Sequence, residues 1–182
     1  MERSSEESII DILKKLNEID YIDPDEIPNI DLYMDQVTTF MDEHLAACRR
    51  TDDDKILTKT MINNYSKAKV ITPVKGKKYT KEQIIQMLII YQLKNNLSIQ
   101  EIKDLLTPIY ENNDDLSNLY DHFIDIKHSL NFQLQKMIQK IMDDYQLKIE
   151  NYQDLFLLVA ILSSLSHSLT NIAEMLIETK EI

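Results

Sequence analysis

Lysine side chains gather around the single glycine of the chain. Gly76 lies in the stretch VITPVKGKKYT, residues 70–80, between Lys75 and the pair formed by Lys77 and Lys78. Ammonium groups attract phosphate oxygens without reading a sequence, and glycine lets a backbone turn at positive φ and approach a ligand closely. These residues predict a tight turn that touches the backbone of a polyanion. A lysine-rich surface hairpin with no partner is the alternative interpretation.

A short predicted helix ahead of this turn carries side chains that could read bases. Thr58 is placed to cap the segment KTMINNYSKA, residues 59–68, because its hydroxyl can accept from a free amide of the first turn. A carboxamide pairs bidentately with N6 and N7 of adenine. Asn63 or Asn64 could therefore read adenine edges if this helix faces DNA, and the alternative is a polar surface at a helix end.

Charge is segregated along the sequence. Residues 55–103 contain ten lysines and two acids, a local net charge of +8, although the 182-residue chain has a net charge of −11. A basic segment makes a local positive field that can meet a polyanion, while acidic flanks repel it elsewhere. The pattern favours a DNA-binding face over a merely solvated surface.

The elements that must position these residues are nearly all helical. One glycine and four prolines in 182 residues leave few turn signals, which favours an α-helical protein. The extended arms of a hairpin are expected only around residues 70–80, where Val70, Ile71 and Val74 favour strand. The predicted fold is all-α with a small β-hairpin wing. Helices are expected over residues 8–19, from an Asp31 cap to about Ala47, over 115–147 and over 151–179. Two further helices are expected over 81–95, with a capping box at Thr80, and over 99–106, with a capping box at Ser98 and an end at Thr107-Pro108.

The C-terminal third predicts two long helices. Apolar residues recur every three or four positions over 115–147, so this helix is expected to pack against a second copy or fold back on the last one. Residues 155–173 contain no formal charge, which is long enough for a membrane span. Serines, His167, Thr170 and Asn171 crowd the second half, and this favours a buried or intersubunit helix instead.

The central residues resemble a known DNA-binding domain. TKTMINNYSKAKVITP followed by KGKKYTKEQIIQMLIIYQLKNNLSIQEIKDLL is similar to the DNA-binding domain of MerR-type regulators, over about residues 32–107. That family has Arg-Tyr-Tyr-Glu in its second helix, then Leu-Leu-x-Pro, a basic-x-Tyr-Ser run and a closing Ser-Leu-x-Glu-Ile-Lys-x-Leu-Leu motif. The matching positions are Tyr65, Val70, Ile71, Pro73, Lys77, Tyr79 and Ser98–Leu106.

The resemblance has departures. Asn63 replaces the family's phosphate-binding arginine, Asn64 the first tyrosine, Ser66 the glutamate and Lys69 the usual glycine. Taken whole, the chain also resembles an uncharacterised family of low-GC Gram-positive bacteria that is known only as a domain of unknown function.

The resemblance implies three segments and a set of DNA-binding residues. The segments are an N-terminal helix and acidic linker (1–30), a MerR-like winged helix domain (31–108) and a helical dimerisation or effector domain (114–182). Tyr65 is expected to contact phosphate or to pack beneath the wing. The DNA-binding residues implied are Thr58, Lys59, Asn63, Asn64, Tyr65, Lys67, Lys69, Lys75, Gly76, Lys77, Lys78 and Tyr79.

The expected function is a transcriptional regulator that binds a pseudo-palindromic site on DNA as a homodimer. The competing hypothesis is a helical protein-interaction module that keeps the fold and offers its lysines to an acidic partner. Loss of the family arginine at Asn63 favours this second hypothesis.

Catalytic and metal chemistry find little support in the sequence. The chain has no glycine-rich phosphate loop, no GxSxG and no HExxH, so we expect no enzyme. His44 and Cys48 are four residues apart, but structural zinc needs four ligands, and we expect no metal and no cofactor. The single cysteine and the lack of a basic-apolar leader predict a cytoplasmic protein.

Overall fold

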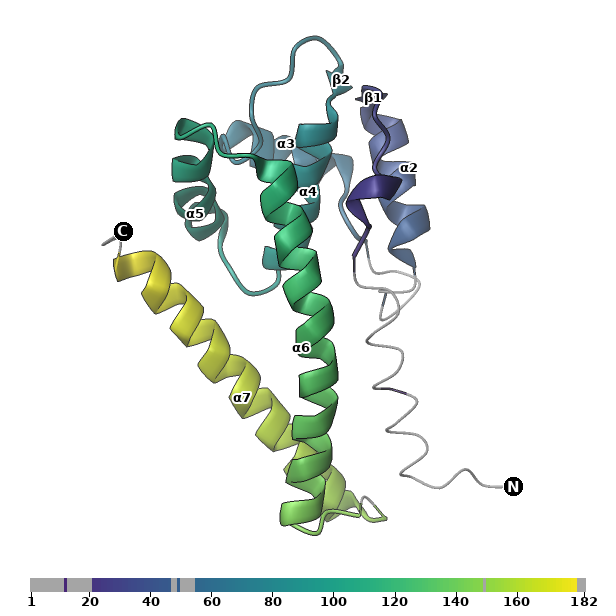
Figure 1. Cartoon of the computed structure of the whole chain (residues 1–182), viewed down its shortest axis with the longest axis vertical. Helices are drawn as coiled ribbons and strands as arrows, with labels where there is room; N and C mark the ends of the chain where they lie inside the picture. Colours follow the sequence, from purple (N-terminus) through teal and green to yellow (C-terminus); the bar gives the residue numbers. More distant parts are fainter. Residues whose placement is uncertain (1–11, 13–20, 47–48, 50–54, 149, 180–182) are drawn as a thin grey trace. The chain divides into compact units, whose positions relative to one another are not determined.

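The computed structural model describes residues 12, 21–46, 49, 55–148 and 150–179. Within them the fold is all-α with one small two-stranded antiparallel sheet, as expected from the sequence (Figure 1). The helix expected over residues 8–19 lies outside the described residues, apart from Ile12. The elements are η1 (Pro24–Glu26), β1 (Leu32–Tyr33), α2 (Met34–His44), α3 (Lys59–Lys67), β2 (Lys78–Tyr79), α4 (Lys81–Leu93), α5 (Ile99–Glu111), α6 (Leu116–Asp144) and α7 (Tyr152–Thr179).

The chain divides into two compact units, and α6 belongs to both. The first unit contains the described residues among 21–124 together with 177–179, and it has one continuous core whose buried residues run from Ile22 to Ile124. Its central helix is α4, which is apolar on nearly all sides and accordingly buried on nearly all sides. The Tyr120 hydroxyl of α6 donates to the Ile22 carbonyl at 2.8 Å. The core therefore extends beyond residues 31–108 at both ends.

Local capping signals were read correctly from the sequence. The Thr58 hydroxyl accepts from the Met61 amide at 3.1 Å and begins α3. Thr80 with Gln83, and Ser98 with Glu101, form the predicted capping boxes at the starts of α4 and α5. In each case the side chain satisfies an amide that has no partner within the helix.

Two expected boundaries were wrong. Asp31 does not cap α2, because Leu32 and Tyr33 form β1 and Tyr33 holds the N-cap position. Pro108 does not close α5, which continues to Glu111 with the proline inside it. The Asn112 amide still donates to the Pro108 carbonyl, since proline lacks only the donor.

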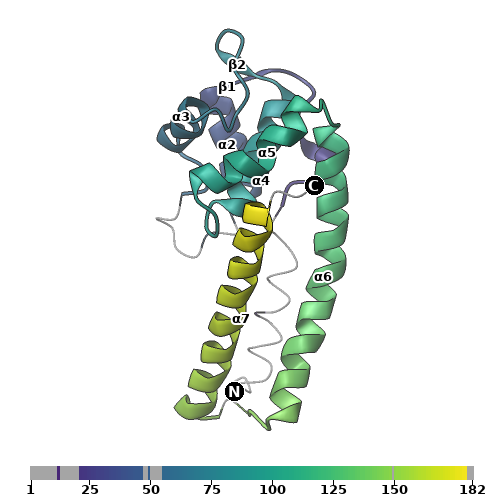
Figure 2. The same ribbon diagram turned by 90° about the vertical axis from the view of Figure 1, so that its left-hand side faces the viewer.

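The strand partner also differs from the expected one. Lys78 and Tyr79 pair antiparallel with Tyr33 and Leu32, which precede α2, whereas the sequence suggested a hairpin with residues 70–74. Figures 1 and 2 show β1 and β2 side by side, with a loop ahead of β2. We call the residues of this loop between Pro73 and Lys78, which include Lys75, Gly76 and Lys77, the lysine loop. The loop is therefore anchored to the first strand of its unit.

The second unit contains residues 125–176 and is built from a helical hairpin. α6 and α7 pack against each other near their connecting turn, where Figure 1 shows them close together. Among the described residues, the buried core of this unit contains Ile138, Met142, Leu147 and Leu158. α7 is long and apolar enough to cross a membrane by length and composition, and only 6% of its most apolar window is buried. Among the described residues, most of the apolar surface of α7 is therefore exposed.

Candidate nucleic-acid interface

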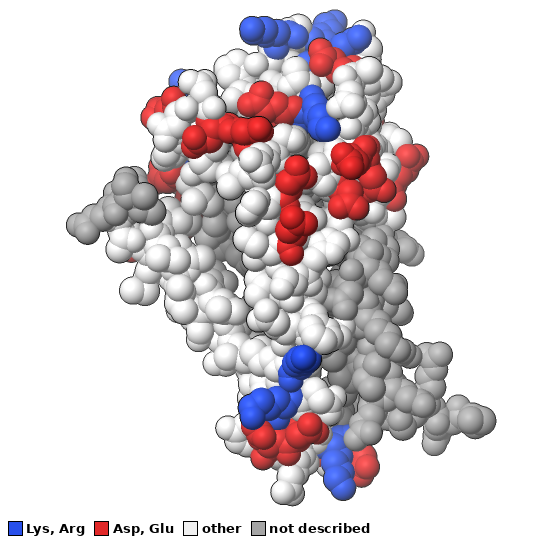
Figure 3. All heavy atoms as spheres, viewed as in Figure 1, with Lys and Arg blue, Asp and Glu red and all other residues white. Residues whose placement is uncertain are grey.

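An exposed basic surface is formed by α3 and the loop that leads to β2. No acid occurs between Lys55 and Lys81, a stretch with eight lysines. Figure 3 shows basic side chains gathered over the loop ahead of β2, with acidic side chains in a band below. Seven of the eight lysines are exposed, namely Lys55, Lys59, Lys67, Lys69, Lys75, Lys77 and Lys78. We call these seven the lysine surface.

Helix α3 divides cleanly into a core face and a solvent face. Ile62 and Tyr65 are buried on one side. Thr60, Asn63 and Lys67 are exposed, with Asn64 beside them, and residues three or four apart share one face of a helix. Both asparagines therefore present their carboxamides to solvent next to a lysine, and no acid lies within α3.

The two tyrosines of the predicted site lie in the core. Tyr65 and Tyr79 are each 6% exposed and belong to the main hydrophobic cluster. Burial raises the pKa of both phenols above the ordinary value. Tyr65 thus follows the packing alternative, and the lysine surface includes neither ring.

Two lysines of the surface are engaged by residues near β1. Lys59 forms an ion pair with Asp35 of α2, which offsets part of its charge. The Lys78 ammonium lies 5.0 Å from the centroid of the Tyr33 ring, its direct cross-strand partner. Within the described part of the chain, Lys67, Lys75 and Lys77 form no ion pair.

Lys69 occupies a left-handed backbone position at the end of α3. Its φ is 61°, its amide donates to Ser66, and the Val70 amide donates to the Tyr65 carbonyl at 2.9 Å. This is a Schellman motif, in which glycine is the usual residue. The position corresponds to the glycine of the resembled family, so the requirement for positive φ is present although the glycine is not.

Gly76 has the turn geometry expected from the sequence. Its φ is +82°, a region that side-chain-bearing residues rarely adopt, and no atom lies within 4 Å of where a Cβ would be. The glycine is needed for the dihedral angle of the turn, and the space around it is open. Thr58 is half-buried and serves α3 as its cap.

Sequence reasoning missed two buried glutamines that support the loop. Gln83 and Gln86 of α4 are 5% and 0% exposed and hydrogen-bond to the segment at Thr72 and Pro73. Their signal was present in the sequence as two polar residues, three apart, in the otherwise apolar run IIQMLII and its preceding turn. Tyr33 was missed as well, because its contact with Lys78 depends on a long-range strand pairing.

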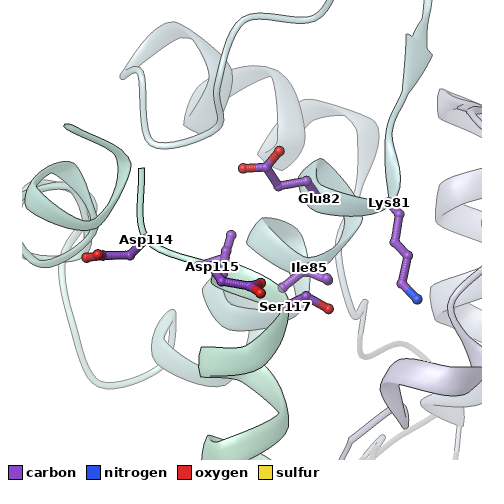
Figure 4. A pocket seen from close by; sticks show the side chains of 7 residues that line it. Lys81, Glu82, Ile85, Asp114, Asp115 and Ser117 are labelled. Atoms are coloured by element: carbon purple, nitrogen blue, oxygen red, sulfur yellow. The ribbon is translucent and has the colours of Figure 1, made fainter. Parts of the chain in front are cut away.

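The other candidate sites do not bring metal-ligating or catalytic side chains together among the described residues. The His44 Nδ1 donates to the Phe40 carbonyl at 2.8 Å within the same helix, while Cys48 lies outside the described residues. No group of three or more possible metal-ligating side chains occurs among the described residues. A pocket of about 380 Å³ lies between the starts of α4 and α6. Figure 4 shows that the carboxylates of Glu82, Asp114 and Asp115 do not converge in it.

A comparison with known protein families gives a match to the first unit. A family model described as Domain of unknown function (DUF1836) matches residues 22–123. A search of curated proteins and a search of solved structures each gave no match. The matched range coincides with the core that runs from Ile22 to Ile124 and covers more than half of the 182 residues. The chain therefore belongs to the DUF1836 family.

Proposed function

We propose that the protein is a bacterial transcriptional regulator that binds DNA as a homodimer in the cytoplasm. The observation that carries the proposal is the lysine surface, whose seven lysines are exposed and come from a segment, residues 55–81, that contains no acid. The chain as a whole has a net charge of −11 and repels a polyanion, whereas a local excess of lysines attracts one.

In this proposal the first unit is a MerR-like winged helix. The order strand, helix, short helix, lysine loop, returning strand and two helices supports it. α3 would lie in the major groove, where Asn63 or Asn64 can pair with adenine. Lys75 and Lys77 would contact phosphates from the loop and supply affinity without sequence information.

The dimer would form through α7. In the half of α7 beyond the hairpin core, Leu165, Leu169, Ile172 and Leu176 recur in spacings of four and three, which is the heptad pattern of a coiled-coil seam. Leu165, Leu169 and Ile172 are 37%, 66% and 53% exposed. The opposite face carries Ser163, Ser164, His167, Thr170 and Asn171. In this half of α7 the apolar seam lies on one face, which fits a helix partner better than a membrane span, where lipid would contact all faces.

Binding of genomic DNA fragments across a salt series tests the proposal. The logarithm of the association constant should fall with the logarithm of salt concentration by about 0.9 for each phosphate neutralised. Changing Lys75, Lys77 and Lys78 together to Ala should weaken binding to all fragments alike and make that slope shallower. Changing Lys127, Lys136 and Lys140 of α6 to Ala removes the same charge elsewhere, and binding should change little.

Sequence reading by α3 is tested separately with Asn63→Ala. This change should alter which fragments are preferred, and a uniform loss on all fragments would contradict base reading. If the wild-type protein retains no fragment at low salt, the regulator proposal fails. The lysine surface would then serve an acidic protein partner, the role that loss of the family arginine at Asn63 favours.

A further inference from the structure

The segment that enters the lysine loop is held by two side chains of α4. The Thr72 amide donates to the Gln86 Oε1 at 2.9 Å, and the Thr72 hydroxyl lies 3.2 Å from the same oxygen. The Gln83 Nε2 donates to the carbonyls of Thr72 and Pro73 at 3.0 and 3.2 Å. Gln83 also accepts from the Thr80 amide at 3.0 Å through its Oε1. One glutamine therefore bridges the two ends of the loop, from Pro73 to Thr80.

The chain has no packing reason to place amides at these positions. α4 is otherwise apolar toward the core, and buried polar groups cost free energy unless they are hydrogen-bonded. The Gln86 Nε2 is buried and finds no partner among the described groups. An apolar side chain would avoid that cost, but it would leave the Thr72 amide without its acceptor. The Gln83 Oε1 serves the capping box of α4, whereas the Gln83 Nε2 and the Gln86 Oε1 are explained by the loop segment that they hold.

The far end of the loop is fixed as well. Lys78 and Tyr79 pair with β1, and the Lys78 ammonium lies over the Tyr33 ring. Between Pro73 and Lys78 only four residues remain, and Gly76 sets their turn. A loop so short, and held at both ends, has little conformational freedom left to lose on binding.

We infer that Gln83 and Gln86 are positioning residues that preorganise the lysine loop for phosphate contact. The inference rests on the proposed function for its ligand, but the hydrogen bonds themselves do not. A preorganised loop binds more tightly because less ordering remains when the ligand arrives. Neither glutamine touches the ligand, so the number of neutralised phosphates does not depend on them.

The test uses the full-length protein with Gln83→Met and Gln86→Met, alone and together. Methionine keeps the length of the side chain and removes the amide. Thr72→Val is the matched control, because it removes the hydroxyl but leaves the amide that donates to Gln86. The first readout is hydrogen exchange of the Thr72 amide, which should be slow in the wild type and in Thr72→Val. It should become at least about tenfold faster in Gln86→Met, since the acceptor is gone.

The second readout is DNA affinity across a salt series, measured where each variant is folded by circular dichroism. The double variant should bind about tenfold more weakly, because the loop must be ordered on binding, with the salt slope unchanged. Equal affinity for the wild type and the double variant, or a slope reduced as in the lysine variants, overturns the positioning role. If Gln86→Met leaves the hydrogen-exchange rate of the Thr72 amide unchanged, Gln86 does not hold the segment at Thr72. If the wild type binds no DNA while Thr72 protection is lost in Gln86→Met, the proposed function fails and the hold on the loop stands.

Discussion

At the scale of single residues, the one glycine of the chain lies in the lysine loop. Three helices are instead followed by a residue that has a side chain and a left-handed backbone conformation. Lys69, Asn113 and Gln146 have φ of 61°, 54° and 55°. Each follows a helix and takes part in the paired hydrogen bonds of a Schellman motif. A left-handed backbone costs roughly 1–2 kcal/mol for a residue with a side chain. Lys69 and Gln146 therefore hold strain that glycine would relieve, whereas asparagine, as at Asn113, adopts this conformation readily.

Lys69→Gly should stabilise the first unit. Relief of the left-handed strain outweighs the extra entropy that glycine has in the unfolded chain, so we expect a gain of about 0.5–1 kcal/mol in the free energy of unfolding. Urea denaturation followed by circular dichroism measures it. Lys67→Gly, two residues earlier and inside α3, is the matched control and should cost about 1 kcal/mol. A loss of stability in Lys69→Gly would show that its side chain, not its backbone, matters there.

At the scale of elements, a tyrosine joins α5 to the segment that follows α3. The Tyr110 hydroxyl donates to the Val70 carbonyl at 3.1 Å. Burial raises the pKa of Tyr110 above the ordinary value, and the Glu82 carboxylate adds to the rise. Because the folded pKa is raised, the stability from this phenol is complete below the ordinary tyrosine pKa of about 10. It is lost as the pH rises above that value.

Tyr110→Phe should therefore have a pH-dependent effect on stability. At pH 7 the variant loses a hydrogen bond, and we expect its free energy of unfolding to be lower by about 0.5–1.5 kcal/mol. Above pH 10 the wild type loses stability that the variant never had, so the difference should shrink. Tyr145→Phe, at a position 71% exposed, should show no such trend. Urea titrations at pH 7 and pH 11 measure both, and a difference that is constant with pH would contradict the assignment.

How much the sequence predicted depends on the range of the interaction concerned. The caps at Thr58, Thr80 and Ser98 are decided within four residues, so a local pattern was enough to find them. The pairing of Lys78 with Tyr33 joins residues 45 positions apart, and no local signal specifies it. The lysines of the site were found by charge. Gln83 and Gln86 were missed because their partner, the backbone at Thr72, becomes visible only when α4 is packed against the loop.

At the scale of the whole molecule, charge and apolar surface are divided between the two units. The lysine surface belongs to the first unit, and the uncovered apolar seam of α7 to the second. Two copies of a chain with net charge −11 repel each other over most of their surface. Residues 155–173 carry no formal charge, so this stretch of α7 is where two copies can approach without that repulsion. The heptad spacing of apolar residues in α7 and the absence of charge in this stretch therefore both favour the proposed dimer.

Leu165→Glu with Leu169→Glu should break that dimer. Both side chains are exposed in the single chain, so the change should leave the helical signal intact while it places like charges across the seam. Light scattering should give twice 21.4 kDa for the wild type and 21.4 kDa for the variant. Affinity for a two-half-site DNA should fall by about 10²–10⁴-fold, because the second half-site is no longer tethered.

The matched control for this experiment lies on the other face of the same helix. Ser163→Glu with Ser164→Glu adds the same charge beside the seam positions, and both the mass and the DNA affinity should stay as in the wild type. A wild-type mass of 21.4 kDa at micromolar concentration would contradict the dimer. Sedimentation of that monomer with phosphatidylcholine vesicles, lost in Leu165→Glu with Leu169→Glu, would assign the seam to lipid instead. Because an interfacial helix needs only one apolar face, the seam pattern alone does not separate these two outcomes, whereas the mass does.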